Sequence, residues 1–127
     1  MIPAEAKAIV KTQLKEPRSA ANSADATGSF IAVAPIEGSM VITQQTGAIT
    51  GTLAGTIETA EAANGLNNLA LTPDDGSAFT SVSGANNTQK KVFNARQNRG
   101  YIKYIGTVGT GPVLLAVLIE GRPKTTT

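Results

Sequence analysis

Two pairs of neighbouring carboxylates are the residues whose types and spacing best suggest chemistry. Glu58 and Glu61 are three residues apart, and Asp74 and Asp75 are adjacent. Glycoside hydrolysis needs two carboxylates across a cleft, but both pairs fall in turn or strand-end contexts. The chain has no Cys and no His, so a Ser or Thr nucleophile would have only Lys or a carboxylate as its base. We therefore expect that the protein is not an enzyme.

Two glycine-containing motifs are similar to ligand-binding loops but lack the residues that binding needs. Asp74-Asp75-Gly76 begins like a calcium loop, yet the alternating oxygen ligands and the final bidentate Glu are missing. Gly106 to Gly111 offers a glycine-rich phosphate cradle, but Pro112 and an apolar strand follow where a helix would be required. We expect turns at both places, with no metal and no cofactor.

The composition limits the partners of the chain. At 127 residues it fits one domain, and its 11 basic and 9 acidic residues are too few and too dispersed for a nucleic-acid-binding face. The longest apolar run, Val113 to Ile119, is far short of the ~20 residues of a membrane-spanning helix. The start lacks the basic and apolar segments of a secretory signal. We expect a chain made in the cytoplasm, with neither nucleic acid nor membrane as its partner.

Among the elements that would position the residues named above, two apolar runs near the end of the chain stand out. Tyr101 to Val108 and Val113 to Ile119 flank Gly109-Thr110-Gly111-Pro112, a pattern typical of an antiparallel hairpin. Alternation in the second run puts Val113, Leu115, Val117 and Ile119 on one face and Leu114, Ala116 and Leu118 on the other. Both faces are apolar, so both must be covered. We expect the protein's own core on one side, and a second copy or a different protein on the other.

Short apolar runs separated by turn residues predict the rest of the fold. We expect strands within Phe30–Ile36, Met40–Gln45, Gly47–Ala60, Leu69–Thr72, Phe79–Val82 and Lys90–Ala95, with a turn at Glu37-Gly38-Ser39. Such spacing favours an all-β, antiparallel β-sandwich of about seven or eight short strands, jelly-roll-like or Ig-like.

The first 29 residues are harder to interpret. Ala4 to Glu16 suits either a helical face or an extended arm, and Pro17 ends either one. Arg18 to Ser29 is small and polar, which predicts a loop or mobile linker. We therefore divide the chain into an extended N-terminal arm and linker, 1–29, and a β-sandwich domain, 30–127. The first sixteen residues either reach a neighbouring subunit or pack on their own domain as a first strand.

Three stretches resemble a known pattern: Leu71 to Gly84 around Asp75-Gly76, Arg99 to Pro112, and Glu120 to Lys124. The order of a DG-centred hairpin, an arginine-aromatic strand, a GT-rich turn and a final apolar strand ending in Gly-x-Pro-Lys resembles the small β-sandwich virion proteins of tailed bacteriophages. Many of these proteins are head decoration or cement subunits, and others lie in the neck or tail.

The resemblance implies a capsid decoration or cement subunit that stabilises the head by bridging capsomers. It implies the major capsid protein as partner, a location on the capsid surface of the virion, and a homo-oligomer, with a trimer favoured. We expect subunit contacts through Tyr104, Leu114 and Leu118. We expect contact with the capsid through the arm Ile2 to Glu16, by way of Ile2, Ile9, Val10 and Leu14.

Two alternatives remain. A neck or tail structural protein would differ only in location and symmetry. A carbohydrate- or cell-surface-binding sandwich module would need aromatic platforms, for which the chain offers only Tyr101, Tyr104 and three Phe, beside Asn-rich loops.

Overall fold

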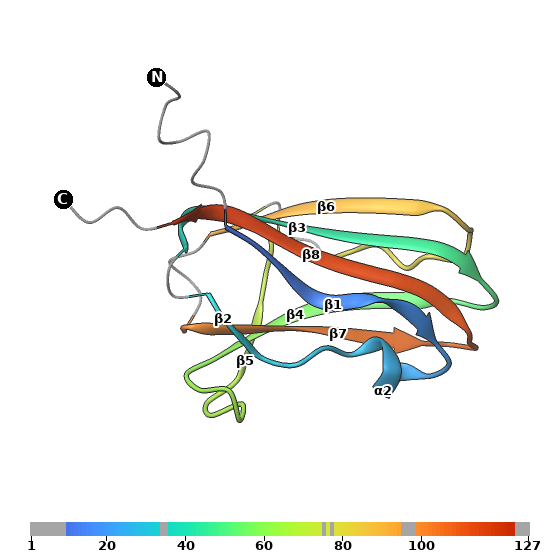
Figure 1. The fold of residues 1–127 in the computed structure, drawn as a ribbon, viewed down its shortest axis with the longest axis horizontal. Helices are drawn as coiled ribbons and strands as arrows, with labels where there is room; N and C mark the ends of the chain where they lie inside the picture. Colours follow the sequence, from blue (N-terminus) through green and yellow to red (C-terminus); the bar gives the residue numbers. More distant parts are fainter. Residues whose placement is uncertain (1–9, 34–35, 75, 77, 95–98, 124–127) are drawn as a thin grey trace, which may run out of the picture.

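The computed structural model describes residues 10–33, 36–74, 76, 78–94 and 99–123, which form two antiparallel four-stranded sheets packed face to face (Figure 1). The first sheet has the strand order β1-β8-β3-β6 and the second β2-β7-β4-β5. The elements are β1 (Val10–Ala20), α2 (Ser23–Ala26), β2 (Ile31–Ala32), β3 (Ile36–Ile49), β4 (Leu53–Ala60), β5 (Leu69–Leu71), β6 (Asn87–Asn94), β7 (Tyr101–Val108) and β8 (Val113–Pro123). The predicted antiparallel β-sandwich is confirmed.

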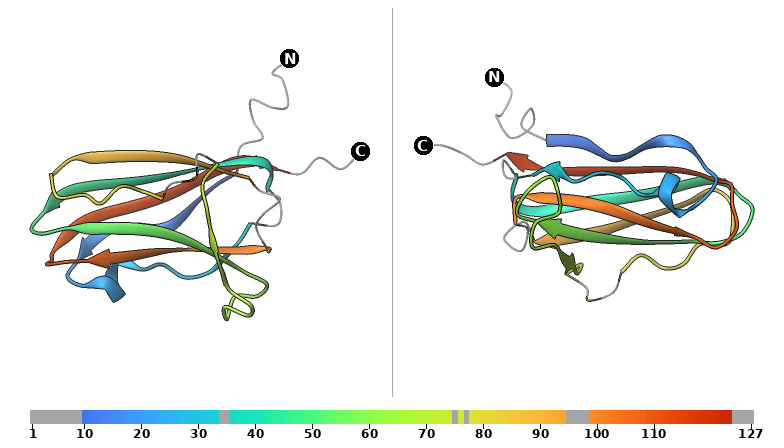
Figure 2. Two further views of the ribbon diagram at one scale, coloured as in Figure 1. Left: turned by 180° about the vertical axis from the view of Figure 1, so that it is seen from behind. Right: turned by 90° about the horizontal axis from the view of Figure 1, so that it is seen from below.

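The core lies between the two sheets, whose layers are seen edge-on in Figure 1 and overlap in the view from below (Figure 2, right). Strand alternation sends every second side chain of the central strands into it. Val117 and Ile119 of β8, Ile42 of β3 and Ile102 of β7 are each 0% exposed. Burying one such side chain contributes about 1.5–3 kcal/mol, so these strands hold the two sheets together.

One hydrogen bond crosses the core between the sheets. The hydroxyl of Tyr104 on β7 donates to Oε1 of Gln44 on β3 at 2.6 Å, and both residues are 0% exposed. Gly55 on β4 makes room for the pair, because a Cβ there would lie 2.5 Å from the Tyr104 hydroxyl and closer still to Gln44 Oε1. Burial raises the pKa of Tyr104 well above its ordinary value, so the phenol stays protonated and donates.

The predicted hairpin is wrong. β7 pairs with β2 and β4 in the second sheet, whereas β8 pairs with β1 and β3 in the first. The connection Gly109 to Pro112 therefore joins the two sheets. A hairpin would place the two strands side by side in one sheet, but each carries a full apolar row and takes an interior place in a different sheet.

The chain from Val10 onward belongs to the sandwich, so the predicted boundary at residue 29 is wrong. β1 pairs with β8, with Val10 opposite Gly121 and Ala20 opposite Val113. This agrees with the alternative that the segment packs as a first strand. Residues 1–9 lie outside the described part of the chain.

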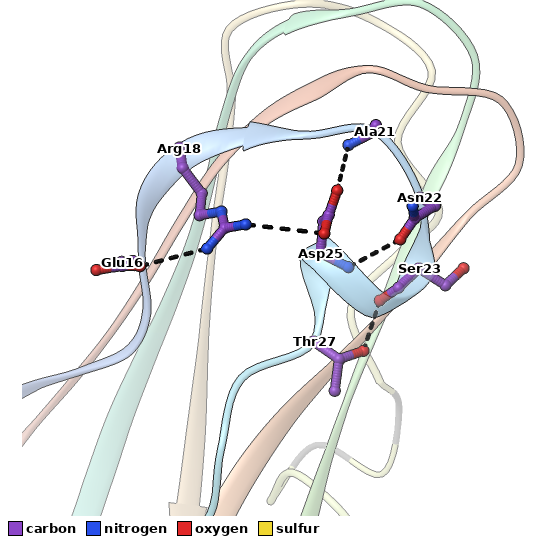
Figure 3. A network of polar contacts seen from close by, with 7 residues as sticks. All are labelled: Glu16, Arg18, Ala21, Asn22, Ser23, Asp25 and Thr27. Atoms are coloured by element: carbon purple, nitrogen blue, oxygen red, sulfur yellow. Dashed lines mark hydrogen bonds and ion pairs between the residues drawn. The ribbon is translucent and has the colours of Figure 1, made fainter.

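The segment Arg18 to Ser29, predicted as a loop or linker, ends β1 and contains α2. The side chain of Asn22 caps this helix by accepting from the amide of Asp25 at 3.0 Å, and the Arg18 guanidinium lies 3.7 Å from the Asp25 carboxylate (Figure 3). The Ser23 hydroxyl accepts from the amide of Val108 at 2.9 Å, which ties α2 to β7. Local capping thus compensates for the segment's lack of apolar residues.

Two other expectations change. The turn predicted at Glu37 to Ser39 does not form, because β3 runs through it with a register shift between Glu37 and Met40. The strand predicted at Phe79 to Val82 is reduced to one bridge, between Val82 and Leu53.

The space around the Tyr104–Gln44 pair can be tested with glycine substitutions. Gly55→Ala should lower the free energy of unfolding by about 1–3 kcal/mol, because the added methyl group overpacks the core. Gly84→Ala is the matched control, since nothing lies within 4 Å of a Cβ built there. Equal stability of the two variants in urea unfolding would contradict this packing.

The raised pKa of Tyr104 predicts a pH dependence of stability. Above the ordinary value of 10.0, the unfolded state loses the phenol proton while the folded state keeps it. The unfolded state then binds fewer protons, so the free energy of unfolding falls by up to about 1.4 kcal/mol per pH unit. Tyr104→Phe should be less stable at pH 7 by about 1–3 kcal/mol but should lose less with rising pH. If the free energies of unfolding of the two proteins fell in parallel between pH 9 and 11.5, the phenol of Tyr104 would not be buried as described.

Candidate functional site

The two sides of β8 have different environments. Val113, Val117 and Ile119 are 0% exposed and Leu115 is 3% exposed, whereas Leu114 is 45% and Leu118 is 39% exposed. β8 lies between β1 and β3, so its backbone is paired on both edges. The sandwich therefore covers one apolar side of this strand and leaves the other at the surface.

The neighbouring strands extend this surface. Leu118 is opposite Thr43 on β3, which is opposite Lys90 on β6. One row further, Val41 is opposite Val92, which is 42% exposed. Because directly paired residues point to the same side of a sheet, these side chains share one face. On β1, Gln13 is opposite Leu118 and Ser19 is opposite Leu114, and both are exposed. We define the outer face of the first sheet by Gln13, Ser19, Val41, Thr43, Gln45, Lys90, Val92, Leu114, Ala116, Leu118 and Glu120.

The outer face is hollowed at one end, beside Leu114. The strands on both sides of this residue are irregular, with a register shift in β1 between Lys15 and Arg18 and one in β3 between Thr46 and Ile49. The open hollow has a volume of about 540 Å³. Its lining consists of Pro17, Arg18, Gln45, Thr46, Gly47, Asn86, Thr88, Leu114, Leu115 and Ala116.

The edges of the first sheet are poorly suited to pairing with another strand. β1 contains Pro17 and two register shifts, and Pro and bulges are devices that block edge-to-edge association. β6 carries Lys90 and Lys91, and the carbonyl of Val92 accepts from the amide of Asp74 at 2.8 Å. Another protein is therefore more easily accommodated on the face of this sheet than at its edges.

The residues predicted for subunit and capsid contacts lie in different environments. Leu114 and Leu118 lie on the outer face. Tyr104 is in the core, so its predicted role in subunit contacts is wrong. Leu14 is 2% exposed inside the protein's own core, so its predicted contact with the capsid is also wrong. Val10 starts β1, and Ile2 and Ile9 lie outside the described residues.

Sequence reasoning missed two features of the surface. Val92 was placed in an expected strand, and its alternation with the buried Phe93 was the signal that one of them faces outward. Leu66 and Leu69 are also exposed, at 53% and 52%. Leu69 is the first residue of β5 in the second sheet, and Leu66 lies in the loop between β4 and β5.

The residues first considered for chemistry have structural roles. The Glu58 carboxylate accepts from the Asn68 amide at 3.0 Å, and Glu61 accepts from Asn67, which ties the ends of one loop together. Pro73 and Gly76 close a turn through a 2.9 Å backbone hydrogen bond, while Asp75 lies outside the described residues. Among the described residues, no group of three or more carboxylates could hold a metal ion.

The helical structure in the described part of the chain lacks the length and hydrophobicity that a membrane crossing requires. Burial lowers the pKa of Lys15, and the neighbouring Arg18 lowers it further.

One face of the Phe30 ring is covered by a cation, because Lys103 Nζ lies 4.8 Å from the ring centre.

Comparison with known proteins gives the class of fold. No protein-family model and no curated protein matches the chain. The fold is similar to that of a crystal structure, the SPBc2 prophage-derived protein YomS, with a TM-score of 0.56 and 15% identity over 89% of this chain and 93% of that one. A structure from Bacillus endospore appendages, described as disulfide-linked pili, matches at a TM-score of 0.42 and 10% identity over 98% and 97% of the two chains. The first likeness shows a shared fold, and the second score is too low to do so.

The contrast between the two sides of β8 can be measured on neighbouring residues. Ile119→Ala should lower the free energy of unfolding by about 2–5 kcal/mol, because it leaves a core cavity. Leu118→Ala should cost less than about 1 kcal/mol in the isolated chain, because its side chain is already partly in water. Denaturant unfolding at low micromolar protein concentration, where association is minimal, separates the two. Similar losses for both variants would contradict the assignment of the faces.

Proposed function

We propose that this chain is a structural subunit of a tailed-phage particle, and in particular a decoration or cement protein on the capsid surface. The observation that carries the proposal is the outer face of the first sheet, which leaves Leu114, Leu118 and Val92 exposed on a rigid sandwich. Two further points support it: the chain shares its fold with a prophage-derived protein, and three stretches resemble phage virion proteins.

The mechanism is the burial of this surface at subunit junctions. Fully burying a Leu or Val contributes about 1.5–3 kcal/mol, so covering the exposed fractions of Leu114, Leu118 and Val92 contributes on the order of 1 kcal/mol each. A single contact of this size is weak. Repeated over many copies on a shell, it resists the outward pressure of packaged DNA.

The partner in this proposal is the major capsid protein, and the subunit is made in the host cytoplasm before it joins the particle. Residues 1–9, which contain Ile2 and Ile9, are the remaining part of the arm expected to contact the capsid. The protein acts by binding and needs no cofactor, no nucleic acid and no membrane.

A carbohydrate- or cell-surface-binding module is the weaker candidate. Its expected aromatic platform loses Tyr104 to the core, and the ring of Phe30 is in contact with Lys103. Binding of the purified protein to a glycan array, with no affinity for phage particles, would favour this module over the structural role.

Imaging of purified virions tests the proposal. We expect density for the chain at regular positions on the capsid surface, and fewer copies per head when Leu118→Lys replaces the wild type. Leu66→Lys is the matched control, because it introduces the same charge at a similarly exposed Leu in the loop between β4 and β5, away from the outer face. Density in the neck or tail would reject the head location. Absence of the protein from the particle would reject the structural role.

A further inference from the structure

We propose that the outer face of the first sheet is a self-association surface, on which a second copy of this chain packs face to face about a twofold axis. The inference deepens the proposed function and takes its biological meaning from it. It is tested on purified protein without any particle, so either idea can fail while the other stands.

The size of the face matches the lower limit of a specific interface. Four strands about 4.8 Å apart are about 19 Å wide, and eight residues at about 3.4 Å each are about 27 Å long. Two such faces cover on the order of 1,000 Å² together, which is about the minimum for a biological contact. A smaller partner, such as a single peptide strand, would leave much of this surface in water.

The charge of the face suits contact with its own copy. Among its defining residues, the charged ones are Lys90 on β6 and Glu120 on β8, and Lys11 on β1 is opposite Glu120. A face of one sign would repel a second copy and attract a partner of opposite charge. This face carries both signs, with Leu114 and Leu118 along its middle strand, so Glu120 of one copy can lie against a Lys of the other.

The symmetry of the expected oligomer follows from the use of a single binding face. A patch that binds itself forms an isologous, twofold dimer, whereas the trimer implied by the resemblance needs two different patches that fit each other. Leu66 and Leu69 are exposed too, but they lie in the β4–β5 loop and in β5 of the other sheet. Because only one face is used, we infer a dimer in which β8 of one copy lies over β8 of the other. The hollow beside Leu114 gives room for side chains of the partner copy.

Sedimentation equilibrium of the purified chain over low to high micromolar concentration tests the inference. We expect the mass of two chains at the upper end, and at least a 30-fold weaker dimer for Leu118→Lys, because one substitution places two like charges in the twofold interface. Leu66→Lys should dimerise like the wild type. A wild type that stays monomeric, a trimer, or loss of association only in Leu66→Lys would overturn it.

A second measurement holds even if Leu118→Lys impairs folding. The chain has no Cys, so a single introduced thiol reports one position. Thr43→Cys lies in the middle of the outer face, and packed sheets are about 10 Å apart. A bismaleimide of similar span should therefore link two chains at this position. Thr56→Cys, on exposed Thr56 of β4 in the second sheet, is the control. Equal cross-linking at both positions, or none at position 43, would overturn the inference.

Discussion

A strand with two apolar sides in a two-layered protein is the constraint on which this structure depends. β8 pairs on both edges and sends Val117 and Ile119 into the core. Both edges and one face of this strand are therefore covered by the chain itself. No other layer of the described chain covers Leu114 and Leu118. The hydrophobic effect then favours a second polypeptide over this face, and the proposed assembly role rests on that preference.

The sheet that carries this face is joined to the second sheet through its inner side. Gln44 and Tyr104 join β3 to β7 through the core, and Gly55 keeps the space that their polar atoms occupy. The Nε2 of Gln44 has no hydrogen-bond partner among the described residues, and a buried unpaired donor costs free energy. The hydrogen bond and the close packing beside Gly55 therefore join the two sheets, and the unpaired Nε2 offsets part of that stabilisation.

Alternation and turn chemistry were enough to predict the fold class and the outward positions of Leu114 and Leu118. They could not tell which strands share a sheet, because pairing depends on contacts between distant segments, so β7 and β8 were wrongly joined as a hairpin. The apolar character of a residue does not show whether it is buried in the protein's own core or exposed for contact with a partner. Leu14 and Tyr104 were therefore predicted as contact residues, although both lie in the core. Arg18 to Ser29 looked like a linker because its order comes from caps and ion pairs, which composition does not reveal.

The central claim is that a second copy of this chain covers Leu114 and Leu118. The most direct measurement is methyl NMR of leucine-labelled protein with a soluble paramagnetic agent, at high and low protein concentration. The account predicts that the methyl signals of Leu114 and Leu118 are protected at high concentration and broadened on dilution, while those of Leu66 are broadened throughout. Broadening of Leu114 and Leu118 that is the same at every concentration, up to the millimolar range, would contradict it.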